Sequence, residues 1–200
     1  MQGRPVYAPA IIPHDWLRAV DLPLACGLPE EDLECLVALT VANFFGWRAS
    51  FVFSVPLTSV QWGPDERGHP TIEFGTSVLK VSPLYPVGRL ALQELPGLFK
   101  VVLTLVVARK GQREWEFLFG PLASARGQAA AWLTGCVRRV NQLYGLHLPL
   151  ESHALKRGAA SCLDALQLAP HKINMHVGWS PGSNSLLHYK RAVSVEDIDR

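Results

Sequence analysis

The sequence predicts a mainly helical α+β fold with a small antiparallel β-sheet. Two helical patterns carry this prediction: one follows an acidic start at residues 29–32, and the other ends at Gly145. Two short runs of strand-forming residues flank the turn-rich segment 63–70, which indicates a β-hairpin. No internal repeat or linker-like tract divides the 200 residues, so we expect one domain over residues 1–200.

The first predicted helix begins at Pro29. A proline followed by Glu30, Glu31 and Asp32 is typical of a helix start, where carboxylates interact favourably with the positive end of the helix dipole. The side chains that continue one helical face are Leu33, Leu36, Val37, Thr40 and Phe44. Gly46 is expected to end this helix.

The middle of the chain is predicted in three parts. Residues 57–62 and 71–74 are expected to form the two strands of the hairpin. Residues 78–96 contain four prolines and glycines, which favours an irregular surface connection. Residues 98–108 suit a strand by their valine-rich centre and a short helix by their length, so both alternatives stay open.

Two further helices are predicted in the second half. Residues 124–144 place apolar side chains at helical spacing, and Gly145 supplies the stop. Another helix is expected from about His153 to Leu166, with Ser152 as its N-cap. Shorter helical segments are expected around Ile173 and Leu186.

Composition limits the possible functions without choosing one. The net charge is only +2, so a nucleic-acid surface would require local clustering of basic residues. The four cysteines have no metal-type spacing, and the chain does not open with a secretory signal pattern, so an intracellular compartment and no metal are expected. No apolar run approaches the ~20 residues of a membrane span, so we expect a soluble protein without a membrane partner.

The most informative stretch is residues 152–160. A helix start that carries His153, Lys156 and Arg157 would favour a bound phosphate, because its free backbone N–H groups and its dipole both attract anions. The alternative is a helix with ordinary surface cations. This motif alone does not decide between the two interpretations.

The residues that follow resemble those of the tyrosine recombinase (phage integrase) family. In that family a box of the form HxLRRG or HxxR opens a helix, a GH or GW box follows, and a nucleophilic tyrosine lies about nine residues further on. Here His153 and Gly158 match the first box, Gly178 and Trp179 match the second, and Tyr189 follows ten residues after Trp179. The resemblance implies an integrase-like catalytic domain without the family's N-terminal core-binding domain.

The resemblance extends over approximately residues 29–191. Residues 44–50, followed by 57–60, look like the family's first-arginine box, which makes Arg48 the first catalytic arginine. The family also places a lysine on a hairpin loop between the two halves. Lys80 is the chosen match, with Lys100 and Lys110 as weaker substitutes.

What the resemblance implies is DNA breaking and rejoining through a 3′-phosphotyrosyl intermediate, as in site-specific recombination or integration by a mobile element. Tyr189 would be the nucleophile, and Arg48 with a second cation would clamp the phosphate, where negative charge grows. His153 would handle the tyrosine proton and Lys80 would protonate the departing 5′-oxygen. Trp179 would pack and donate one hydrogen bond. No cofactor or metal is expected, and the expected partners are duplex DNA and further copies of the chain.

The chain departs from the family pattern in ways that bear on activity. Lys156 occupies the position of the second arginine, which keeps the charge but loses the forked, bidentate contact. Arg157 is the candidate to compensate, since it lies on a neighbouring part of the same helical face. Phe51 stands where the family commonly has an acidic residue.

Two alternatives to an active enzyme follow from these departures. A catalytically degraded descendant would be a DNA-binding or regulatory module, and an unrelated helical protein would match the motifs by chance. Under the clamp interpretation, Lys156→Arg should raise cleavage unless Arg157 already supplies the contact.

Overall fold

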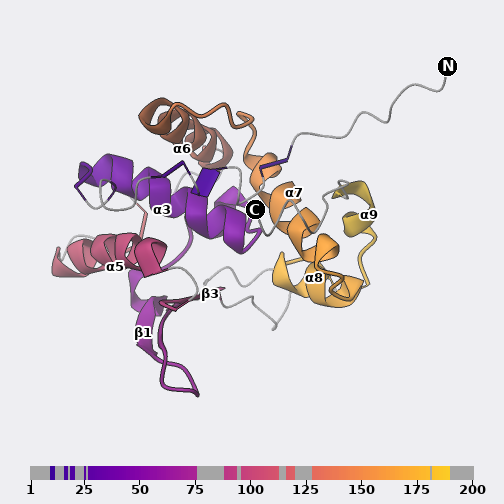
Figure 1. The fold of residues 1–200 in the computed structure, drawn as a ribbon, viewed down its shortest axis with the longest axis horizontal. Helices are drawn as coiled ribbons and strands as arrows, with labels where there is room; N and C mark the ends of the chain where they lie inside the picture. Colours follow the sequence, from indigo (N-terminus) through magenta and orange to yellow (C-terminus); the bar gives the residue numbers. More distant parts are fainter. Residues whose placement is uncertain are drawn as a thin grey trace.

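The computed structural model confirms the mainly helical α+β fold with a small antiparallel sheet (Figure 1). It describes residues 10–11, 16–17, 19–20, 25, 27–75, 88–93, 96–112, 116–119, 128–180 and 182–189. Residues 188 and 189 are described by their backbone alone. The helices are α3 (Glu30–Phe44), α4 (Ala49–Val52), α5 (Pro96–Gly111), α6 (Ala129–Tyr144), α7 (Ser152–Ala165), α8 (Pro170–His176) and α9 (Ser185–Tyr189). The strands are β1 (Gln61–Pro64), β2 (Pro70–Phe74) and β3 (Gly88–Ala91), which lie in that order with antiparallel pairing.

Helix α3 is the centre of the fold. Helices α5, α6 and α7 all pack against it, with α6 and α5 on opposite sides and α7 to α9 grouped near one end (Figure 1). The sequence predicts one buried face, but burial extends almost all the way round the helix. The difference arises because three helices cover α3, whereas an amphipathic pattern assumes a single buried side.

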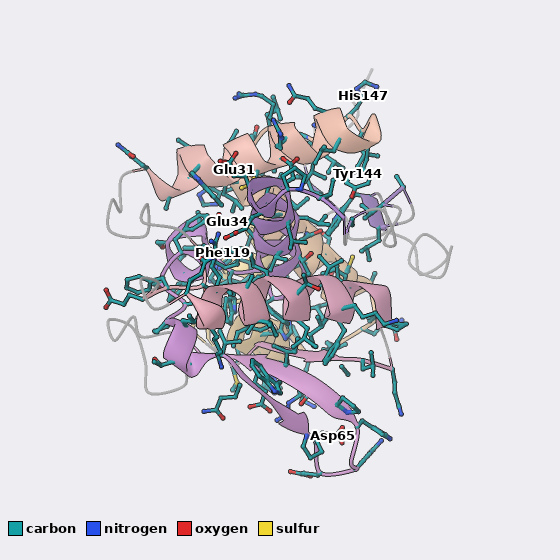
Figure 2. The ribbon with its side chains drawn as sticks, turned by 90° about the vertical axis from the view of Figure 1, so that its left-hand side faces the viewer. Glu31, Glu34, Asp65, Phe119, Tyr144 and His147 are labelled. Atoms are coloured by element: carbon teal, nitrogen blue, oxygen red, sulfur yellow. The ribbon has the colours of Figure 1, made fainter. Side chains whose placement is uncertain are left out.

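Ion pairs connect the acidic start of α3 to its two neighbours. Arg109 of α5 is buried and donates to Glu34 over 2.8 Å, and it also pairs with Glu30. Arg139 of α6 donates to Asp32 over 2.5 Å. Figure 2 looks along α3 and shows Glu34 in the layer between α6 and α5. Two of the carboxylates predicted to start the helix, Glu30 and Asp32, therefore also pair with arginines of neighbouring helices.

The predicted hairpin is confirmed, with Asp65 at its tip (Figure 2). Residues 57–59 form a 3₁₀ helix, so the prediction that the first strand begins at residue 57 is wrong. The backbone there pairs elsewhere: the Leu57 N–H donates to the Glu116 carbonyl over 2.9 Å, and the Leu118 N–H donates to Val55 over 3.0 Å. These bonds hold the segment away from the sheet ladder.

The connection predicted to be irregular contains a third strand. In β3, Leu90 is buried and lies opposite Ile72 of β2, so residues 88–91 extend the sheet and correct that prediction. Residues 76–87, which include Lys80, lie outside the described residues. The open alternative at residues 98–108 resolves to helix α5, because its valines and leucines recur at helical spacing against α3.

Helices α6 and α7 confirm two predicted helices, although α6 begins at Ala129 and the predicted residues 124–127 lie outside the described residues. Gly145 ends α6 with a φ of 64°, a left-handed conformation that suits glycine. Ser152 is the first residue of α7 instead of its N-cap, which is Glu151. A backbone bond explains the change, since the Ala154 N–H donates to the Glu151 carbonyl over 3.0 Å and closes the first turn without a side-chain cap.

Asn43 ties α3 to α7 and to the N-terminal segment. Its side chain is fully buried, and its Nδ2 group donates to the carbonyls of Ile11 over 2.8 Å and Leu155 over 2.9 Å. Its Oδ1 atom accepts from the Trp16 indole N–H over 2.9 Å. One side chain thus fixes the position of α7 relative to the end of α3.

Asn43→Ala is expected to lower the free energy of unfolding by about 3 kcal/mol, because it leaves several buried polar groups without partners. Urea denaturation measures the change. The matched control is Asn141→Ala, since Asn141 also makes two backbone bonds, to Leu148, but is only half-buried, so that water can replace them. If both variants lose the same free energy of unfolding, the buried hydrogen bonds of Asn43 contribute no more than half-buried ones.

Candidate functional site

A pocket of about 180 Å³ opens where helices α4, α6 and α7 begin. A water molecule occupies about 30 Å³ of liquid, so the pocket has room for a phosphate group. The described residues that line it are Trp47, Arg48, Ala49, Ser50, Ala129, Ala130, Ser152, His153 and Lys156.

Two long helices present their N-termini to this pocket. Ala129 and Ala130 are the first two residues of α6, and Ser152 and His153 are the first two of α7. The first N–H groups of a helix have no partner within the helix, and neither α6 nor α7 has a side-chain hydrogen bond at its N-cap. The positive ends of two helix dipoles therefore meet at a place that suits an anion.

The side chains around the pocket are basic. Arg48, His153 and Lys156 line it, and none of its described lining residues is acidic. The nearest carboxylate in sequence belongs to Glu151, which pairs with Arg157 over 2.5 Å. Helix ends and side chains thus favour the same kind of ligand.

The chain reaches Arg48 through a glycine that allows close packing. Gly46 has a φ of +61°, and a Cβ atom there would lie 2.6 Å from Val177 and 3.1 Å from Ala159. Trp47 is buried, with its ring centroid 5.3 Å from that of Phe45. The segment of residues 45–48 between α3 and α4 therefore packs closely against α7, and it leaves Arg48 exposed at the pocket.

Lys156 lies deep in the same site. Its side chain is 1% exposed, and its Nζ atom donates to the Val177 carbonyl over 2.5 Å. The same Nζ atom lies 4.9 Å from the ring centroid of Trp179. Burial, with a smaller contribution from the Arg48 guanidinium, lowers the pKa of Lys156 from its ordinary 10.5 to about 7.

Trp179 belongs to the packing beneath Lys156. It is buried in a small apolar cluster with Ile173, Val177 and Leu186, which joins α7, α8 and α9. Its backbone N–H donates to the Asn174 carbonyl over 2.7 Å. Trp179 therefore supports the floor of the site, and it is not among the pocket's described lining residues.

Three predicted residues are not among the described lining residues of the pocket. Tyr189 ends α9, which packs against α7 and α8, and its side chain is outside the described residues, as is all of Lys80. Arg157 points to its pair with Glu151 and is not among the described lining residues.

The two substitute lysines on α5 make other contacts. Lys100 is exposed, whereas Lys110 donates to the Val60 carbonyl over 2.7 Å and lies 4.3 Å from the ring centroid of Trp62. Neither is among the described residues of the pocket. The structure thus gathers Arg48, His153 and Lys156 at one place and separates these lysines from it.

Sequence reasoning missed the contribution of α6. Ala129 and Ala130 carry no charge or polar side chain, so they act at the pocket only through backbone N–H groups. The available signal was the predicted helix itself, but no local pattern indicated that its start lies beside α7.

In the described part of the chain, no group of three or more His, Cys, Asp or Glu side chains could hold a metal ion. None of its helices is long and apolar enough to cross a membrane.

The fold is shared with site-specific DNA recombinases and integrases, which is the class the sequence motifs predicted. No family model matches the sequence, and no curated protein matches it significantly. The relation is therefore one of fold.

Three solved structures define the likeness. The XerH site-specific recombinase bound to its difH substrate before cleavage matches 92% of this chain with a TM-score of 0.62 and 14% identity. The XerA recombinase matches 98% with a TM-score of 0.64 and 13% identity. The Tn1549 transposon integrase in complex with transposon right-end DNA matches 99% with a TM-score of 0.53 and 14% identity. This chain spans 50%, 64% and 65% of those chains.

Proposed function

We propose that this chain binds duplex DNA with a phosphate in the pocket and breaks and rejoins the strand through Tyr189. The observation that carries the proposal is the convergence of two helix N-termini with Arg48, His153 and Lys156 at one pocket. The fold shared with recombinases whose structures contain DNA supports the choice of ligand. Self-association on DNA is part of the same proposal.

The chemistry needs only the chain's own groups. The Tyr189 hydroxyl oxygen would attack phosphorus while its proton passes to His153, and the bond to the 5′-oxygen would break. Arg48 and the helix N-termini would stabilise the negative charge on the non-bridging oxygens. The resulting phosphotyrosyl bond conserves the bond energy, so attack by a 5′-hydroxyl reverses the step and rejoins the strand without a nucleotide cofactor.

A DNA-binding or regulatory module is the second candidate, and Lys156 is the observation that favours it. The lysine is buried and bonded to the Val177 carbonyl, so it does not offer the two-pronged contact that an arginine would. The pocket would then hold a DNA phosphate without assisting the departure of its 5′-oxygen.

A suicide DNA substrate tests the two candidates together. It is a nicked duplex from which the short 5′-hydroxyl fragment diffuses away after cleavage, so that a covalent protein-DNA adduct accumulates. An enzyme is expected to form the adduct, and Tyr189→Phe is expected to abolish it because phenylalanine has no nucleophilic oxygen. Binding that weakens steeply with salt, without an adduct, would support the module. If the protein neither binds the DNA nor forms the adduct, both candidates are refuted.

A further inference from the structure

We propose that Lys156 is the proton donor to the departing 5′-oxygen, in place of a phosphate clamp. The inference rests on the proposed DNA cleavage and names a residue for a step that the sequence resemblance gives to Lys80. It begins from the position of Lys156, which lines the same pocket as Arg48 and His153.

The hydrogen bonds of Lys156 leave donors for a ligand. An ammonium has three N–H groups, and the Val177 carbonyl takes one of them. Trp179 lies under the same nitrogen, so the side chain is held between the indole ring and the pocket. A phosphate oxygen that enters the pocket would therefore meet an oriented N–H group that is shielded from bulk water.

The charges around Lys156 make its proton transferable. Arg48 faces it from the link between α3 and α4, and His153 lies one turn earlier on α7. Glu151 and Arg157 pair with each other, and the His176 ring of α8 bonds to the Phe44 carbonyl over 3.2 Å.

In the part of the chain that the structure describes, no carboxylate forms an ion pair with Lys156. An amine whose charge is opposed by burial and by a neighbouring guanidinium gives up a proton far more easily than an exposed lysine does. General acids work best with a pKa close to the operating pH. An arginine at this position could hold a phosphate but could not donate its proton at neutral pH.

Bonds and protons balance in the proposed step. The Tyr189 oxygen forms a bond to phosphorus, the bond from phosphorus to the 5′-oxygen breaks, and its electron pair stays on that oxygen. The Lys156 ammonium transfers one proton to this oxygen, which gives a 5′-hydroxyl and a neutral amine. During rejoining the amine takes the proton back as the 5′-hydroxyl attacks.

A DNA substrate with sulfur in place of the bridging 5′-oxygen tests the assignment. Thiols ionise near pH ~8.5, so a thiolate leaves without a proton, whereas an alkoxide does not. Adduct formation is compared on matched oxygen and sulfur suicide substrates. Lys156→Met and Lys156→Arg are both expected to lose about 100-fold on oxygen DNA and to recover most of that loss on sulfur DNA.

Each other outcome overturns the inference. Equal losses on both substrates would mean that Lys156 only holds the phosphate or the fold, and Lys156→Arg at or above the parent rate on oxygen DNA would mean that it is a clamp. Recovery in Lys80→Met instead of Lys156→Met would place the donor at Lys80. If the parent protein forms no adduct on either substrate, the proposed cleavage fails and the inference fails with it.

Lys172→Met is the matched control, because Lys172 is exposed on α8 and is not among the described pocket residues. It is expected to behave like the parent on both substrates. Circular dichroism of every variant separates a lost proton donor from a lost fold, and the Lys156→Arg variant keeps the positive charge if Lys156→Met fails to fold.

Discussion

Arg48→Ala is expected to lower the rate of covalent attachment to a suicide DNA substrate by about 100-fold or more, because removing one preorganised donor to a reacting oxyanion has an effect of that order. Arg48 is exposed, and no hydrogen bond or ion pair within the described residues depends on its side chain, so the free energy of unfolding should change by less than about 0.5 kcal/mol. Single-turnover adduct formation and urea denaturation measure the two effects.

The control for this prediction is Arg138→Ala. Arg138 is exposed on α6 and is not among the described residues that line the pocket. This variant should match the parent in rate and stability. If both arginine variants lose the same activity, the effect comes from the overall charge of the protein and the pocket has no special part in it.

Lys156→Met is expected to stabilise the protein most at low pH. The pKa of Lys156 is about 7 in the folded protein, against an ordinary 10.5 that applies when the chain is unfolded. Below pH 7 the lysine is charged in both states, so folding carries the full cost of burying the charge. Between pH 7 and 10.5 the folded lysine is neutral while the unfolded lysine still binds a proton, so the parent's stability rises with pH.

The expected gain from Lys156→Met is therefore up to about 5 kcal/mol at pH 6, and it shrinks toward zero near pH 10. Urea denaturation of parent and variant at pH 6, 8 and 10 measures it. Lys172→Met, at an exposed site, should show no such trend. A stability difference that stays constant across this range would contradict the lowered pKa of Lys156.

Local patterns were sufficient to predict much of the fold. The acidic start of α3, the turn between β1 and β2 and the left-handed Gly145 are each specified by neighbouring residues, and all three are present, although α3 begins at Glu30 with Pro29 as its N-cap. The predictions for residues 57–59 and for residues 88–91 are wrong because the structure of these segments depends on partners distant in sequence. These partners are residues 116–118 and strand β2. Propensity does not contain that information.

The candidate site was likewise predictable only in the part that local motifs specify. The motifs around Arg48 and His153 pointed to two side chains that the pocket does bring together. They could not reveal that α6 adds its N-terminus, or that Lys156 is buried against the Val177 carbonyl and the Trp179 ring. The environment of Lys156 depends on how α7 packs on α8, and that packing changes the chemistry available to a residue whose identity alone suggested a weaker arginine.

The most direct test of the account is to locate the attachment point of the DNA on the protein. The adduct trapped with a suicide substrate is digested, and the peptide that carries the nucleotide is identified by mass spectrometry. The account predicts a phosphotyrosyl bond at Tyr189, one of four tyrosines in the chain. Attachment at any other residue, or no covalent attachment under conditions in which the DNA is bound, would contradict it.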